Sequence, residues 1–190
     1  MFARTERLLL RPGWREDAPA LAAAIGDEGI IRNLARAPWP YGEEDALRYL
    51  ESMQTSGLPE FLIFSRTRGA PRLVGGCGIM PDNHEGLELG YWIARPYWGL
   101  GFATEAGKAV VKVARAMDLP KLRAGHFLDN PASGNVLRKI GFRPTGRVSL
   151  RHSSGRGEHA PCALFEEGDP VKMRQDSSED LYHDRHAMAA

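Results

Sequence analysis

LELGYWIARPYWGLGFATEAGKAVVKVA, residues 87–114, joins a strand pattern, a glycine loop and a helix pattern without a break. The β-type run over 87–94 leads into a loop that contains Gly99 and Gly101, and an amphipathic helix follows. The first N–H groups of a helix lack partners inside it, and the helix dipole adds positive potential at that end. Glycine lets the backbone approach a ligand because no Cβ stands in the way. The stretch therefore predicts a binding site for phosphate or pyrophosphate, although two glycines could also serve a tight turn alone.

The composition limits the kind of protein that this sequence can encode. With 190 residues, of which 43% are hydrophobic, the chain suits one domain with a single core, which we place at residues 1–167. Residues 168–190 are polar, lack core periodicity and predict a tail that is mobile or packs on a neighbour. The formal net charge of +1 provides no strong field for nucleic acid or a membrane surface, so we expect neither as a partner.

Two further features bear on compartment and chemistry. No apolar run reaches the ~18–20 residues of a membrane span, and the N-terminal apolar run is too short for a signal peptide. Cys77 and Cys162 lie far apart and show no metal-binding spacing, so we expect two buried free thiols. We therefore expect a cytoplasmic protein without a metal site.

Hydrophobic periodicity and turn residues predict an α+β fold with a mixed sheet. Strands are expected at 7–11, 61–65, 73–80, 87–94, 122–127, 143–151 and 160–166, and helices within 17–26, 43–53, 102–117 and 130–141, with a short helical piece near 30–34. The helix between strands 87–94 and 122–127 makes these two strands a parallel crossover pair. In that helix we expect an inward stripe of Ala106, Ala109, Val110, Val113 and Met117.

Two common phosphate-binding motifs do not fit the glycine loop. A Rossmann fingerprint needs a third glycine where Thr104 stands, and the next strand lacks an acidic residue at its end unless Asp129 serves. A Walker A loop needs Ser or Thr after Gly107-Lys108, where the chain has Ala109, and these residues fall inside the helix. The anion site must therefore belong to another class.

The order of motifs resembles that of the GNAT acetyltransferase superfamily. GYWIARPYWGLGFATEA at 90–106 is followed about 25 residues later by NPASGNVLRKIGF at 130–142. RLLLR, PWPY and VGGCGI strengthen the likeness to its RimJ/RimL-like branch of ribosomal-protein N-acetyltransferases, which extends from Thr5 to Glu166. The resemblance implies an α/β/α-layered, mostly antiparallel, twisted sheet of about seven strands with a splayed parallel central pair and about four helices.

The resemblance also implies acetyl-CoA as co-substrate and locates its contacts. The pyrophosphate loop of the family corresponds to Trp98, Gly99, Leu100, Gly101, Phe102 and Ala103, with Thr104 next. The pantetheine arm is expected between the splayed strands, beside the backbone of Trp92 and Ile93. Asn130 and Ser133 match the family's Asn-x-x-Ser near the sulfur. Asn130 is equally suited to N-cap the helix that Pro131 opens, and Ser133 could be a plain helix-start serine.

Acetyl transfer to an amine needs a base, because an amine with a pKa of ~10 is protonated at neutral pH. Glu88 is the first candidate and His126 the second, with a water relay as the third possibility. Ser133 is expected to protonate the departing thiolate, and a backbone N–H near Trp92 or Ile93 to stabilise the oxyanion. The structural alternatives are a solvated or paired carboxylate for Glu88 and a purely structural histidine for His126.

The acceptor is the least determined part of the prediction. Trp39 and Tyr41 are candidates for the wall of its pocket, although they could instead anchor the core or the loop, and His84 could reach the pocket mouth. The acceptor could be a protein N-terminal or lysine amine or a small-molecule amine, bound by a monomer or a homodimer. The alternative function is a non-catalytic CoA-binding module that acts as a sensor or scaffold.

Overall fold

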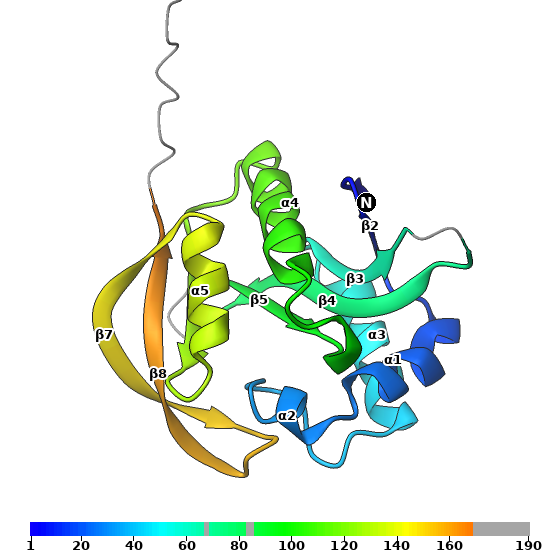
Figure 1. Ribbon diagram of the computed structural model, residues 1–190, viewed down its shortest axis with the longest axis horizontal. Helices are drawn as coiled ribbons and strands as arrows, with labels where there is room; N and C mark the ends of the chain where they lie inside the picture. The colour runs from blue at the N-terminus through cyan, green and yellow to red at the C-terminus, as the bar shows by residue number, and fades with distance from the viewer. Residues whose placement is uncertain (67–68, 83–85, 169–190) are drawn as a thin grey trace, which may run out of the picture.

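The computed structural model describes residues 1–66, 69–82 and 86–168, which build one mixed sheet covered by helices (Figure 1). The strands are β1 (Ala3–Arg4), β2 (Leu8–Arg11), β3 (Glu60–Ser65), β4 (Arg72–Pro81), β5 (Leu87–Ile93), β6 (Leu122–Phe127), β7 (Phe142–Ser153) and β8 (Glu158–Glu167). The helices are α1 (Ala18–Ile25), α2 (Glu28–Ile31), α3 (Glu43–Thr55), α4 (Phe102–Ala116) and α5 (Pro131–Lys139), with 3-10 turns at Arg15–Asp17 and Arg95–Tyr97. The predicted tail lies outside the described residues from position 169 onward.

The strand order within the described residues is β1-β2-β3-β4-β5-β6-β8-β7. Each neighbouring pair is antiparallel except β5 and β6, which are parallel and are connected in the sequence through α4. This arrangement confirms the predicted α+β class and the central parallel pair. The sheet has eight strands rather than about seven because Ala3–Arg4 turns back at Thr5 and pairs with β2.

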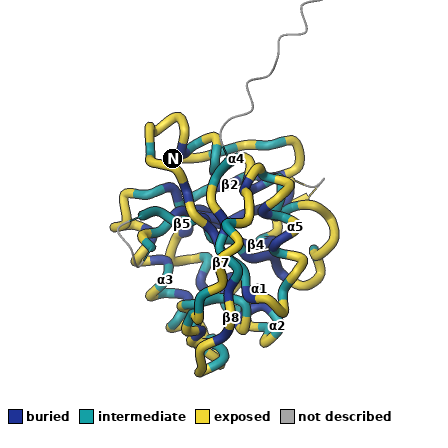
Figure 2. The backbone as a smooth tube through the Cα atoms, turned by 90° about the vertical axis from the view of Figure 1, so that its left-hand side faces the viewer, coloured by how far each residue is buried: buried dark blue, intermediate teal, exposed yellow. Residues whose placement is uncertain are grey.

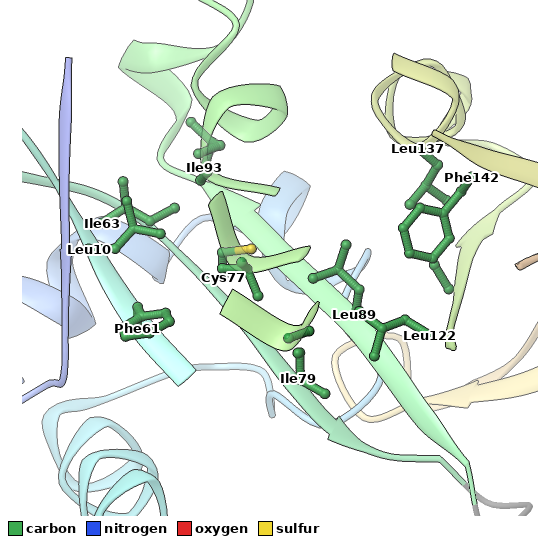
Figure 3. Packing of buried hydrophobic residues seen from close by; sticks show 14 of the residues in the cluster. Leu10, Phe61, Ile63, Cys77, Ile79, Leu89, Ile93, Leu122, Leu137 and Phe142 are labelled. Atoms are coloured by element: carbon green, nitrogen blue, oxygen red, sulfur yellow. The ribbon is translucent and has the colours of Figure 1, made fainter. Parts of the chain in front are cut away.

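Each face of the sheet carries its own hydrophobic core. Helices α4 and α5 lie on one face (Figure 1), where Val110 belongs to the core cluster. Figure 3 shows Leu137 and the strand residue Leu89 of the same cluster. Helices α1, α2 and α3 lie on the other face, where their apolar residues pack with Leu62 and Trp92. Figure 2 shows the buried residues concentrated on the inner segments and the exposed ones on the peripheral loops. We call these two sides of the sheet the α4/α5 face and the α1/α3 face.

The inward side of α4 differs from the predicted stripe. Ala106, Val110 and Ala114 are buried as one line, together with Gly107, whereas Met117 is 36% exposed just after the last helical residue. The cause is the close approach of α5, because a Cβ at Gly107 would lie 3.1 Å from Ile140 Cδ1. The helix therefore turns its smallest residues toward its neighbours, and the prediction for Val113 and Met117 was wrong.

Strands β5 and β6 pair only at their first residues. Their ladder consists of Leu87 with Leu122 and Glu88 with Arg123, after which the two strands separate. On the outer sides the ladders continue, as far as Ile93 between β4 and β5 and as far as Phe127 between β6 and β8. The sheet is therefore split along its middle, and we call the resulting gap between β5 and β6 the slot.

Candidate active site

The glycine loop places unpaired backbone donors at the start of α4. Gly99 and Gly101 have φ of 77° and 80°, a left-handed conformation that favours glycine. The first hydrogen bond of the helix runs from Glu105 N–H to the Gly101 carbonyl. The N–H groups of Phe102, Ala103 and Thr104 therefore have no acceptor inside the helix. A Cβ at Gly99 would meet no heavy atom within 4 Å, so the backbone is open to a phosphate as the sequence predicts.

Side chains from both flanks hold this loop in place. The Trp98 indole N–H donates to the Ile93 carbonyl over 2.6 Å, which ties the loop to the end of β5. Arg7 donates from Nη1 to the Leu100 carbonyl over 3.0 Å and forms an ion pair of 2.7 Å with Glu105. Sequence reasoning missed Arg7, because its partners lie more than ninety positions along the chain. Trp98 thus supports the loop through its side chain, and Arg7 brings a cationic side chain to the loop backbone at Leu100.

Backbone alternation decides which groups of β5 face the slot. Ala94 N–H donates to the Val74 carbonyl of β4 over 2.9 Å. In an antiparallel ladder the pairing direction alternates, so Trp92 points its backbone groups toward β4, and Tyr91 and Ile93 point theirs toward the slot. Of the two predicted backbone donors, Ile93 therefore lies on the slot edge. The Trp92 indole lies on the α1/α3 face, over Gly76.

The start of α5 lies across the slot and carries a hydroxyl pair. Asn130 is the N-cap, with its side-chain oxygen accepting from Ser133 N–H at 3.3 Å, as predicted. The Tyr91 hydroxyl lies 2.8 Å from Ser133 Oγ and donates to the Ser133 carbonyl over 2.9 Å. Burial raises the pKa of Tyr91 above its ordinary value, against the smaller opposing effect of the Ser133 hydrogen bond. Tyr91, which the sequence analysis did not assign, therefore joins Ser133 as a second neutral hydroxyl.

The two predicted bases lie on opposite faces of the sheet. Glu88 stands where β5 and β6 part and forms an ion pair with Arg151 of β7, both side chains being largely buried. Arg123 is opposite Glu88, so alternation puts His126 on the α4/α5 face. There His126 packs on Gly134 and Phe165, and its Nδ1 lies 2.9 Å from the Phe127 carbonyl. The structure does not bring Glu88 and His126 together.

Two of the three residues predicted for the acceptor pocket lie within the described part of the chain. Tyr41 is half-buried and packs in the core of the α1/α3 face, whereas Trp39 is 45% exposed in the loop before α3. His84 lies outside the described residues. At the end of β7, Ser153 Oγ donates to the Leu34 carbonyl over 2.8 Å, and the turn between β7 and β8 follows. Gly155 in this turn packs directly on Ile31.

Neither a metal-binding cluster nor a membrane-spanning helix occurs in the part of the chain that the structure describes. The ranges 1–66, 69–82 and 86–168 hold no group of three or more His, Cys, Asp or Glu side chains arranged for a metal ion. Within the same ranges, no helix combines the length and apolarity that a membrane crossing requires.

Comparison with known proteins identifies the family. A family model described as "Acetyltransferase (GNAT) domain" matches residues 7–143. The chain belongs to the GNAT acetyltransferases. An uncharacterized N-acetyltransferase of Bacillus subtilis (strain 168), YoaA, is 30% identical over 157 residues, which cover 75% of this chain and 82% of that relative. The protein is an acyl-CoA-dependent acetyltransferase, and acetyl-CoA is its co-substrate.

Solved structures of the same fold agree with this assignment. The GNAT-family acetyltransferase from Bacillus anthracis superposes with a TM-score of 0.74 at 25% identity and covers 87% of this chain and 97% of that one. RimL, a ribosomal L7/L12 α-N-protein acetyltransferase in complex with coenzyme A, gives a TM-score of 0.71 at 19% identity, with 88% and 97% covered. At that identity the RimL likeness concerns the fold alone, and it supports the predicted RimJ/RimL-like architecture.

Proposed function

We propose that this acetyltransferase transfers the acetyl group of acetyl-CoA to a primary amine, whose nitrogen attacks the thioester carbonyl directly. The observation that carries the proposal is the slot, which has an edge of β5 that pairs with no strand, helix N–H donors at one end and a hydroxyl pair across it. Cys77 and Cys162 are buried, and burial raises the pKa of both thiols. A thiol that stays protonated is a poor nucleophile, which argues against an acyl-cysteine intermediate.

The residues proposed to bind the co-substrate follow from the slot and the loop. The pyrophosphate is assigned to the backbone of Trp98, Gly99, Leu100, Gly101, Phe102, Ala103 and Thr104, with Arg7 beside it. The slot edge at Tyr91 and Ile93 offers backbone groups to an extended pantetheine arm, as an added strand would use them. Trp92 is retained as a wall of the site on the α1/α3 face, and Asn130 as the cap that positions Ser133.

An acid and a base are proposed on opposite sides of the slot. Ser133, hydrogen-bonded to Tyr91 on the α4/α5 face, would protonate the departing thiolate. Glu88 lies on the other face, from which an amine would approach a thioester held against α4. An amine that attacks from one face while a thiolate leaves toward the other needs this division. His126 shares the face of Ser133 and is the weaker candidate for the base.

The acceptor is proposed to be a protein N-terminal or lysine amine, or a small-molecule amine, in reach of Trp39 and Tyr41. Thiol release from acetyl-CoA, measured with a panel of such amines, tests the reaction, and mass spectrometry of the products identifies the acetylated nitrogen. We expect amine-dependent thiol release with no covalent acetyl-enzyme in the intact mass of the protein. Stoichiometric acetylation of a cysteine before the amine is added would refute direct attack.

A further inference from the structure

Glu60 is a carboxylate on the α1/α3 face that the proposed reaction does not yet use. It is the first residue of β3 and is paired with Gly78 of β4, which is itself paired with Gly90 of β5. A Cβ at Gly78 would lie 2.8 Å from Glu60 Cγ, so the Glu60 side chain lies across the bare backbone of β4. Only the flexible side chain of Met80 covers Gly90 beyond it. Gly78 is buried under the Glu60 side chain and Gly90 lies under Met80, so the flexible Met80 side chain is the group that separates Glu60 from the slot edge.

The face on which Glu60 lies is the one that the acceptor uses. Leu62, two residues along β3, belongs to the core on the α1/α3 face, and so does Trp92 of β5. A cofactor held at the start of α4 occupies the opposite face. An amine that reaches the slot from the α1/α3 face and displaces the flexible Met80 side chain therefore passes beside Glu60.

Glu60 differs from Glu88 and Asp129 in that it forms no ion pair with an arginine of the described residues. Glu88 pairs with Arg151, and Asp129 pairs with Arg156. No salt bridge among the described residues includes Glu60. Burial raises the pKa of Glu60, and the nearby Tyr49 hydroxyl and the Arg36 charge offset this only in part. Such a shift is typical of a carboxylate without a full counter-ion.

The surroundings of Glu60 suit an organic cation. Tyr49 lies beside the carboxylate, and Tyr41 packs in the same cluster. Burial is the main reason that the pKa of Tyr41 rises to about 12 and that the pKa of Tyr49 also rises, so both rings stay neutral at physiological pH. Neutral aromatic rings next to a carboxylate bind ammonium groups through combined cation–π and charged hydrogen-bond contacts.

The distance from the slot determines which ammonium group Glu60 can reach. Strands lie ~4.8 Å apart, so a carboxylate over β4 is about 7 Å from the middle of the slot beyond β5. This exceeds the ~2.8 Å of a charged hydrogen bond, so Glu60 cannot touch the nitrogen that reacts. It can touch a second cationic group of the same acceptor, roughly 5–7 Å from the reacting nitrogen.

Resting on the proposed function, we propose that Glu60 binds a second ammonium group of the acceptor, and that the enzyme therefore prefers diamines to monoamines of the same length. Tyr41 and Tyr49 form the aromatic wall beside this ammonium. Glu60 is a specificity residue in this arrangement, and it takes no proton from the reacting nitrogen.

The test compares amines that differ only in the second ammonium. Thiol release is measured with butylamine against putrescine and with pentylamine against cadaverine, for the wild type, Glu60→Gln and Glu44→Gln. Glu44 is an exposed acid in the first turn of α3 and serves as the matched control. We expect Glu60→Gln to lower kcat/KM for putrescine about tenfold through a higher KM, and to leave kcat/KM for butylamine unchanged. Tenfold is the low end of the effect expected when a partly exposed charged hydrogen bond is lost. Glu44→Gln should leave both values as in the wild type.

A shorter acid provides a readout that a structural role would not affect. Glu60→Asp keeps the charge and withdraws it by one methylene, so the preferred diamine should lengthen from putrescine to cadaverine. Equal losses for butylamine and putrescine in Glu60→Gln, or no loss for either, would overturn the inference. If calorimetry shows acetyl-CoA bound but the wild type releases thiol with none of the four amines, the inference fails together with the proposed small-amine reaction.

Discussion

Removal of the Tyr91 hydroxyl tests the proposed proton donor directly. Tyr91→Phe keeps the ring, so no cavity forms, and deletes the contacts of 2.8 Å to Ser133 Oγ and 2.9 Å to the Ser133 carbonyl. The net loss of a neutral hydrogen bond is about 1 kcal/mol. For a domain of this size that corresponds to a decrease of about 2–4 °C in Tm. We expect this small decrease because the carbonyl of Ser133 loses a donor and no packing is lost.

The effect on turnover should be larger than the effect on stability. Ser133→Ala removes the proposed acid and should lower kcat by about 100-fold, within the usual range for general acid catalysis. Tyr91→Phe leaves Ser133 in place without its partner and should lower kcat about tenfold, since about 1.4 kcal/mol of barrier changes a rate by that factor. The affinity for acetyl-CoA should stay near the wild-type value in both variants.

The double variant distinguishes a coupled hydroxyl pair from two independent groups. If Tyr91 acts through Ser133, then Tyr91→Phe adds nothing in the Ser133→Ala background, and the double variant equals Ser133→Ala alone. Thiol-release kinetics at saturating acetyl-CoA measure kcat, calorimetry measures the dissociation constant, and thermal unfolding measures Tm. Unchanged kcat in Tyr91→Phe, or losses that multiply in the double variant, would refute the coupling of these two hydroxyls.

Three other predictions follow from the loop, the helix packing and the Glu105 network. Gly101→Asp should abolish acetyl-CoA binding in calorimetry, because φ is 80° there and a carboxylate would face the phosphates; wild-type affinity would reject the loop assignment. Gly107→Val should lower the free energy of unfolding by about 1–3 kcal/mol in urea titrations, since even a Cβ lies 3.1 Å from Ile140 Cδ1, and unchanged stability would show that α5 yields freely. The pKa of Glu105 is lowered because its hydrogen bonds from Thr5 and Arg7 outweigh burial, so its stabilisation is present above the ordinary value of 4.5 and is lost as pH falls through the folded value. Glu105→Gln should therefore destabilise the protein most at pH 7 and progressively less as the pH falls below 4.5, and an equal effect over that range would contradict the charge argument.

The sequence predicted those elements that depend on residues close to one another in the chain. Strand β6 and the start of α3 lie where alternation and turn residues placed them. The glycine loop and the Asn130 cap also depend on neighbours within a few positions, and the structure confirms the geometry of both. The splay of β5 from β6 came from the family resemblance alone, and the short ladder at Leu87 and Glu88 confirms it.

Partners that are distant in the chain could not be predicted from the sequence. Arg7 meets Glu105 across 98 positions, Tyr91 meets Ser133 across 42, and Glu88 meets Arg151 across 63. The periodicity of hydrophobic residues cannot predict such pairs, because they depend on how the strands are ordered in the sheet. The buried side of α4 was not fully predicted for the same reason, since it depends on the approach of α5 rather than on the apolar pattern of α4 itself.

Binding of acetyl-CoA in the slot, as proposed, would link the stability of this enzyme to the supply of its co-substrate. Beyond Glu88 the backbone groups on the inner edge of β5 have no partner in β6, although the Ile93 carbonyl accepts from the Trp98 indole. A co-substrate that pairs with this edge binds the native chain and not the unfolded one, and at a hundred times its dissociation constant it adds about 2.7 kcal/mol of stability. The fraction of enzyme that escapes unfolding and proteolysis would then rise and fall with the cellular level of acetyl-CoA.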